Sequence, residues 1–123
     1  MKTVLITGAY RGLGYEVARQ LSERGWKVIL TARRSGQGSA AAAKLKNTSF
    51  LELDITDDRS VAQAAKAVAS LDVLVNNGCR TEMGGSGAPR SVEEGAAGIV
   101  WLAADAPQDK TGLFWRDREV LPW

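Results

Sequence analysis

The sequence contains no histidine and only one cysteine, Cys79, among its 123 residues. Without histidine the chain lacks the commonest general base and a frequent metal ligand, and it has no Cys/His cluster that could hold zinc. A single cysteine excludes an internal disulfide and suits a reducing compartment. We therefore expect a cytoplasmic protein whose fold depends on neither a metal nor a disulfide.

Long apolar runs and blocks of like charge are absent as well. The apolar run after Met1-Lys2 is far too short for a signal peptide or a membrane span. The chain has 16 basic and 14 acidic residues, and no basic block of the kind that binds nucleic acid. Neither a membrane nor a nucleic acid is therefore an expected partner.

The residues that remain have the composition of one globular domain, with 45% hydrophobic and 24% charged residues. The predicted strands are five short apolar runs, at residues 3–7, 26–33, 49–54, 71–76 and 112–117. Continuous apolar strands that alternate with helices are typical of a parallel sheet covered on both faces. We predict a doubly wound α/β domain over residues 1–123, with strand order 3-2-1-4 and the last strand beside the fourth.

Helical patterns fill the intervals between these strands. The first covers residues 13–24, and an alanine-rich helix follows the second strand. Asp57 can cap a third helix, whose expected inward face is Val61, Ala65 and Val68. Ser91 and Glu94 form a Ser-x-x-Glu capping box for a helix that runs to about Ala104.

The segment "TGAYRGLG" lies between the first predicted strand and the first predicted helix. Gly8 permits a sharp turn, Gly12 lets the backbone approach a diphosphate, and Gly14 allows close packing of helix against strand. The free N–H groups at the start of the helix then favour an anion. In this strand–loop–helix context the loop predicts a dinucleotide site, and the alternative is a tight turn without a ligand.

The spacing Thr-Gly-x-x-x-Gly-x-Gly resembles the short-chain dehydrogenase/reductase superfamily, which binds NAD(H) or NADP(H) on a Rossmann fold. "LELDIT" is similar to the family's third strand, where Asp54 would contact the adenine ring. "VNNG" resembles the family's Asn-Asn-Ala-Gly, with Asn76 and Asn77 matching and the alanine missing. The tail from "RTEMGG" onward is similar to carbonyl-reductase-like members. The resemblance covers residues 1–78 and 79–123 as two blocks, and it implies a shortened Rossmann-like sheet.

The resemblance implies a set of cofactor-binding residues, which are Thr7, Gly8, Tyr10, Arg11, Gly12, Leu13, Gly14, Arg33, Arg34, Asp54, Ile55, Asn76, Asn77, Gly78 and Thr81. Thr81 matches the threonine that touches the nicotinamide carboxamide in the family. The second strand ends without a carboxylate and is followed by two arginines, which favours a 2′-phosphate over a free 2′-hydroxyl. We therefore predict NADP(H) rather than NAD(H); the alternative is that two of the three arginines are solvated surface.

The family's catalytic Asn, Ser and Tyr-x-x-x-Lys cannot be located. The only tyrosines, Tyr10 and Tyr15, are followed four residues later by Gly14 and Arg19. The chain passes from "VNNG" directly to "CRTEMGG", so a central block of the family's sequence is missing between them. Because no motif supplies the acid, its lysine or the serine, we assign no catalytic residue.

Several other polar residues have a simpler interpretation. Cys79 could be a nucleophile, but it reads better as a small hydrophobe. Glu82 or Tyr10 could replace the missing acid. The simpler interpretation is that Glu82 is a solvated carboxylate and that Tyr10 belongs to the phosphate loop. The Asp57-Asp58 pair reads as a helix cap rather than an acid/base dyad.

The function therefore stays open between three hypotheses. The first is an NADPH-dependent reductase of a small carbonyl or quinone, with weak or atypical catalysis. The second is a nucleotide-binding or interaction module without chemistry, and the third is a subunit that borrows catalytic residues from another chain. Trp101, Trp115 and Trp123 fit a core or a subunit interface, and we expect a homo-oligomer.

Overall fold

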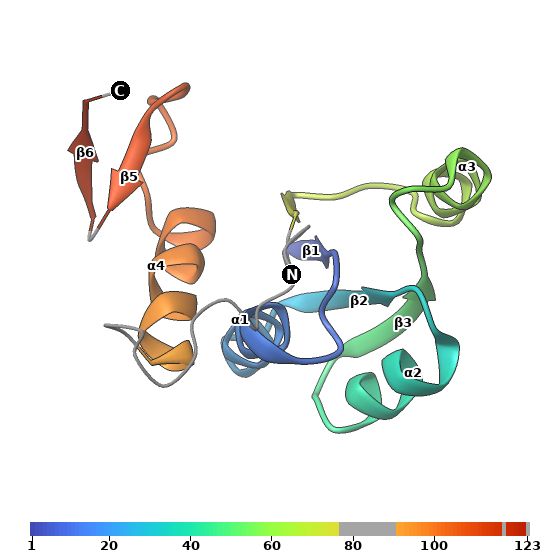
Figure 1. The fold of residues 1–123 in the computed structure, drawn as a ribbon. Helices are drawn as coiled ribbons and strands as arrows, with labels where there is room; N and C mark the ends of the chain where they lie inside the picture. Colours follow the sequence, from blue (N-terminus) through green and yellow to red (C-terminus); the bar gives the residue numbers. More distant parts are fainter. Residues whose placement is uncertain (77–90, 117, 123) are drawn as a thin grey trace.

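The computed structural model describes residues 1–76, 91–116 and 118–122. Its main sheet is parallel and has the order β3-β2-β1-β4 (Figure 1). The bounds of these strands are Thr3–Ile6 for β1, Lys27–Ala32 for β2, Thr48–Glu52 for β3 and Val73–Val75 for β4. This arrangement confirms the strand order 3-2-1-4 that the sequence predicts, and with it the doubly wound, Rossmann-like class.

In the described part of the chain four helices connect or follow these strands, at Gly12–Glu23 for α1, Ser35–Ala43 for α2, Asp58–Ala67 for α3 and Val92–Ala104 for α4. The caps are those that the sequence predicts. Asp57 accepts a hydrogen bond from the N–H of Arg59, and Ser91 and Glu94 form the reciprocal capping box. No helix in the described part of the chain has the length and apolar character needed to cross a bilayer.

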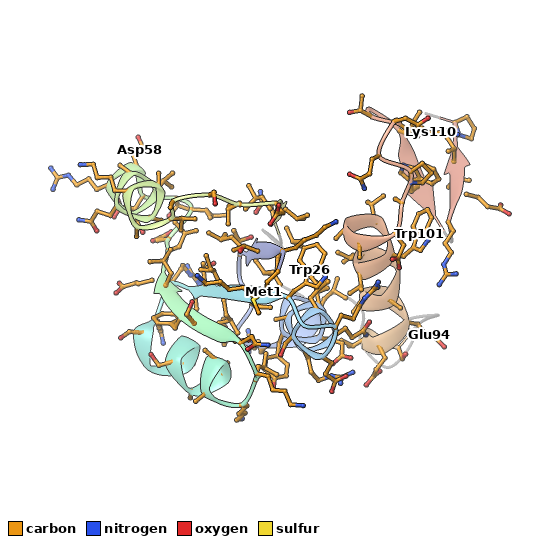
Figure 2. The ribbon with its side chains drawn as sticks, turned by 180° about the vertical axis from the view of Figure 1, so that it is seen from behind. Met1, Trp26, Asp58, Glu94, Trp101 and Lys110 are labelled. Carbon is orange, nitrogen blue, oxygen red and sulfur yellow. The ribbon has the colours of Figure 1, made fainter. Side chains whose placement is uncertain are left out.

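The larger apolar core lies between one face of the sheet and α1. Its fully buried members alternate along β1 and β2 and recur along α1, and they include Val4, Ile6, Val28, Leu30, Val17 and Leu21. α4 packs against α1 and adds Ala96 and Val100 to this core. Trp26, which is 7% exposed, closes the core just before β2 (Figure 2).

The opposite face of the sheet is covered only in part by the described residues. A second, smaller cluster comprises Leu5, Ile29, Leu53 and Ala64. Leu74 on β4 points to the same face as Leu5, its neighbour in the sheet, but is 62% exposed. Among the described residues, α3 therefore covers the end of the sheet near β3, and none covers the edge at β4 (Figure 1).

The predicted inward face of α3 is wrong in its details. Ala64 is the buried residue of this helix, whereas Val61 is 43% exposed and Ala65 is exposed. Val68 is half-buried at the end of the helix. The helix contacts the sheet mainly at β3, and its buried residue Ala64 completes the small cluster with Leu5 and Ile29, so a full apolar stripe is not needed.

The predicted position of the last strand is also wrong. β5 (Phe114–Arg116) pairs with β6 (Glu119–Leu121) in a separate antiparallel hairpin and not with β4 (Figure 1). A hairpin closes a very short loop, which costs less chain entropy than a crossover from α4 back to the sheet. Among the described residues β4 is consequently an edge strand.

The hairpin is held to α4 by aromatic contacts. Trp115 and Trp101 meet edge to face, with their ring centroids 5.4 Å apart. Arg118, in the turn between the two strands, has a φ of 68°, a conformation that costs a non-glycine residue about 1–2 kcal/mol. Its guanidinium lies 6.0 Å from the centroid of the Trp101 ring. Trp101 and Trp115 thus pack against each other outside the main core, and whether they lie in a subunit interface stays a prediction, whereas Trp123 lies outside the described residues.

Two glycines of α2 give a matched test of how closely this helix approaches the sheet. A Cβ atom at Gly38 would collide with the ring of Phe50 on β3, whereas a Cβ atom at Gly36 would meet nothing within 4 Å. We expect Gly38→Ala to lower the free energy of unfolding by about 1–3 kcal/mol. Gly36→Ala should raise it by about 0.4–1 kcal/mol, because it only restricts the unfolded chain. Urea denaturation measures both, and an equal response of the two variants would contradict this packing.

Candidate cofactor site

The glycine loop makes the turn that its sequence predicts. Thr7 is buried at the end of β1, and the chain turns at Gly8, whose φ is 57°. Gly12, with a φ of 64°, begins α1, and Gly14 is buried as the third residue of that helix. Because left-handed φ values favour glycine, Gly8 and Gly12 are required by the backbone itself.

Hydrogen bonds hold this loop against the carboxyl edge of the sheet. The hydroxyl of Thr7 donates a hydrogen bond to Oδ1 of Asn76 at 2.9 Å. The backbone N–H of Thr7 donates to the carbonyl of Val75 at 2.9 Å. The N–H of Ala9 donates to the carbonyl of Thr31 at 3.0 Å. The loop is therefore fixed to both strands that flank β1.

The first turn of α1 has no side-chain cap among the described residues. Its N-cap, Arg11, makes no capping hydrogen bond, and the turn contains no acidic residue. α3 and α4 are capped by Asp57 and Ser91, whereas α2, like α1, has no side-chain cap. The opening N–H groups of a helix need acceptors, and the positive end of its dipole attracts anions. The start of α1 thus has the chemistry of a phosphate site.

Three arginines follow β1 and β2 at the same edge of the sheet. The Arg11 guanidinium lies 5.3 Å from the centroid of the Tyr10 ring. Tyr10 and Leu13 are half-buried and pack against the main core. Arg33 and Arg34 are exposed directly after β2, and Arg34 is the N-cap of α2. The edge therefore carries cations close to the glycine loop.

Asp54 and Ile55 follow β3 at the neighbouring position along this edge. Oδ1 of Asp54 accepts hydrogen bonds from the hydroxyl of Thr56 at 2.7 Å and from its N–H at 3.0 Å. These bonds, with a smaller contribution from the charge of Arg33, lower the pKa of Asp54 below its usual value. Ile55 is 47% exposed and offers an apolar surface beside this carboxylate.

Part of the predicted site lies outside the described residues. This applies to Asn77, Gly78 and Thr81, and also to Cys79 and Glu82. The described part of the chain contains no group of three or more His, Cys, Asp or Glu residues that could hold a metal ion. The described geometry therefore concerns the phosphate and adenine end of the predicted site.

Sequence reasoning missed two polar residues that support the site. Thr31 is fully buried in β2, and its hydroxyl donates to the carbonyl of Ile6 at 2.9 Å. The hydroxyl of Ser60 accepts a hydrogen bond from the N–H of Asp54 at 2.8 Å. A threonine inside an otherwise apolar strand was a visible signal for the first, whereas Ser60 looked like any other helix residue.

Known proteins match this chain over the same elements. The model of the short chain dehydrogenase family matches residues 2–94. (-)-Isopiperitenone reductase from Mentha piperita is 46% identical over 85 residues, which cover 59% of this chain and 27% of the reductase. A solved short chain dehydrogenase/reductase family protein superimposes with a TM-score of 0.61 at 27% identity, over 84% of this chain and 48% of its own.

A third relative is a short-chain dehydrogenase from Sphingobium yanoikuyae, solved in complex with NADPH. It superimposes with a TM-score of 0.55 at 30% identity, over 60% of this chain and 32% of its own. This chain thus spans less than half the length of each of the three proteins. Because the family model matches most of the chain, including the glycine loop and the whole parallel sheet, the protein belongs to the short-chain dehydrogenase family.

Proposed function

We propose that this protein binds NADP(H) at the glycine loop, as a single nucleotide-binding domain. The observation that carries the proposal is the uncapped start of α1, which directly follows a turn built by Gly8 and Gly12. A diphosphate at this point would accept hydrogen bonds from the free N–H groups of the helix. The NADPH complex of the structural relative supports this choice of ligand.

Charge at the end of β2 supports the phosphorylated form of the dinucleotide. Arg33 and Arg34 are exposed, and neither forms an ion pair with a described residue. Guanidinium groups bind phosphate oxygens through two parallel hydrogen bonds. Together with Arg11 they would hold the 2′-phosphate, while Asp54 and Ile55 would border the adenine and Asn76 the inner end of the cofactor.

The proposed activity is a weak or atypical reduction of a small carbonyl or quinone. Bound NADPH supplies the hydride, and the residues of this chain bind and orient it. A positioned acid typically contributes about 10²–10⁴-fold to such a reaction, and this sequence has no Tyr-x-x-x-Lys to supply one. Quinones and activated carbonyls are therefore the more suitable substrates.

Turnover of the purified protein with NADPH and a panel of carbonyls and quinones distinguishes the proposed reductase from two alternative functions. Steady turnover supports the reductase. Tight binding without turnover supports a non-catalytic nucleotide-binding or interaction module. Turnover that needs a second protein supports a subunit that borrows catalytic residues.

We also propose a cytoplasmic homo-oligomer. The single cysteine is the basis for the compartment. The open edge at β4 and the exposed Leu74 are the basis for self-association, because such edges and apolar surfaces favour pairing with another chain.

Nucleotide preference tests the binding proposal. We expect micromolar binding of NADPH and much weaker binding of NADH, measured by calorimetric titration. Arg33→Ala should weaken NADPH binding about 10–100-fold, which corresponds to the loss of one charged hydrogen-bonding group, and leave NADH binding unchanged. Lys44→Ala, at the opposite end of α2, removes the same charge away from the loop and is the matched control. Equal affinity for both nucleotides, or an Arg33→Ala variant with unchanged NADPH affinity, would contradict the proposal.

A further inference from the structure

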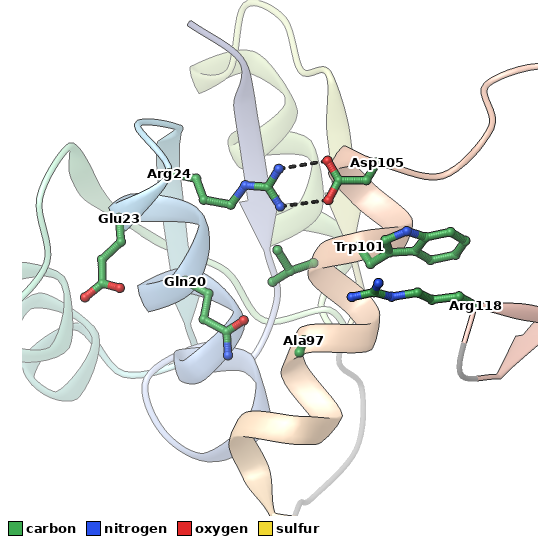
Figure 3. A pocket seen from close by; sticks show the side chains of 8 residues that line it. Gln20, Glu23, Arg24, Ala97, Trp101, Asp105 and Arg118 are labelled. Atoms are coloured by element: carbon green, nitrogen blue, oxygen red, sulfur yellow. Dashed lines mark hydrogen bonds and ion pairs between the residues drawn. The ribbon is translucent and has the colours of Figure 1, made fainter.

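A concave site lies at the far end of α1 from the glycine loop. It is a cleft of about 360 Å³ between the last turn of α1, one side of α4 and the hairpin (Figure 3). This volume falls within the range of about 300–1,000 Å³ that is usual for small-molecule sites. The cleft shares no residue with the proposed cofactor site.

The inner wall of the cleft is apolar and comes from α4. Val100 is 4% exposed, Ala97 lies one turn earlier, and Trp101 is half-buried at the mouth of the cleft. The edge-to-face contact with Trp115 holds the Trp101 indole in place. An apolar group that enters the cleft would therefore meet a fixed apolar surface.

Most of the charges around the cleft are already paired. Arg24 donates two hydrogen bonds to the carboxylate of Asp105, at 2.8 and 3.0 Å. This contact raises the pKa of Arg24 and lowers that of Asp105. Glu23 is paired with Arg19 at 2.9 Å along the same helix. Arg24 and Asp105 therefore neutralise one another without a ligand, whereas Arg19 is shared between Glu23 and Glu16.

Arg118 is the exception. Its guanidinium lies over Trp101 and points into the cleft, and it forms no ion pair with a described residue (Figure 3). Its φ of 68° is a conformation in which hairpin turns favour glycine or asparagine. The residue preferences of hairpin turns therefore do not explain why residue 118 is an arginine. Non-glycine residues with a strained backbone tend to occur at functional positions.

We propose that this cleft binds a small monocarboxylate with an apolar body. The carboxylate would receive two parallel hydrogen bonds from Arg118, a geometry that a guanidinium provides and an ammonium does not. The apolar body would lie against Ala97, Val100 and Trp101. A singly charged ligand fits better than a phosphate dianion, because the carboxylate of Glu23, whose partner Arg19 is shared with Glu16, lines the same cleft and repels excess negative charge.

The test uses 3-phenylpropionate as the probe and its uncharged amide as the control. We expect saturable binding of the acid by calorimetry, with a shift of the Trp101 indole N–H signal in NMR spectra. The amide should bind about 10–100-fold more weakly, because it cannot form charge-assisted hydrogen bonds with Arg118. Equal affinities for acid and amide, or no saturable binding of the acid, would overturn the proposal.

Arg118→Gly separates binding from folding. Glycine accepts the positive φ, so the hairpin and the urea midpoint should be retained while binding of the acid falls at least about 10-fold. Arg118→Lys keeps the charge without the planar fork and should bind with intermediate affinity. NADPH affinity should be unchanged in both variants, so a failure of the cofactor proposal would be seen separately. Full binding of the acid by Arg118→Gly would refute the assigned role of Arg118.

Discussion

Gly12→Val is expected to weaken NADPH binding by about 100-fold or more. The φ of Gly12 is 64°, and left-handed backbone costs a residue with a side chain about 1–2 kcal/mol, with β-branched residues least tolerant. The new side chain would also stand where the backbone must approach the diphosphate. The strain is present with and without the ligand and therefore lowers stability, so the loss of affinity comes from the clash with the diphosphate, which must cost about 2.8 kcal/mol for a 100-fold effect. Calorimetric titration measures the loss.

Gly25→Val is the matched control for this prediction. Gly25 also has a positive φ, 85°, but a Cβ atom there meets nothing within 4 Å, and the residue follows the far end of α1. It should lose a similar amount of stability through backbone strain and retain NADPH affinity. If both variants lost affinity to the same extent, the effect would be one of folding and not of the glycine loop.

Leu21→Ala is expected to lower the free energy of unfolding by about 2–5 kcal/mol. Leu21 is fully buried on α1, in the core that joins the sheet, α1 and α4. A cavity at this position removes contacts that the surrounding side chains cannot replace without moving. Because domains of this kind have a total stability of about 5–15 kcal/mol, the loss is a large fraction of it. Urea denaturation followed by far-UV circular dichroism measures the change.

Leu74→Ala, which removes the same atoms from the β4 edge, is the control. Leu74 is 62% exposed, so its substitution should change the stability of the isolated chain by at most about 0.5 kcal/mol. A loss equal to that of Leu21→Ala at all protein concentrations would contradict the assignment of the core. A loss that grows with protein concentration would instead show that a second copy covers the edge, in support of the homo-oligomer.

Features that depend on neighbouring residues were readable in the sequence. The caps at Asp57 and Ser91 are set by side chains within three residues of the N–H groups that they bind. The positive φ angles of Gly8 and Gly12 follow from the spacing of the glycine loop. The strand order 3-2-1-4 could be predicted because short right-handed crossovers leave few alternatives for a parallel sheet.

Features that depend on distant residues were not readable. The bond between Thr7 and Asn76 joins residues 69 positions apart, and no local pattern signals it. β5 pairs with β6 and not, as predicted, with β4. The short loop of the hairpin costs less chain entropy than a long crossover back to the sheet, and the balance between the two also depends on packing. Arg24 and Arg118 look alike in the sequence. Only the packing of α1, α4 and the hairpin pairs the first with Asp105 and leaves the second without an ion pair among the described residues, because ion pairing depends on distances that tertiary contacts create.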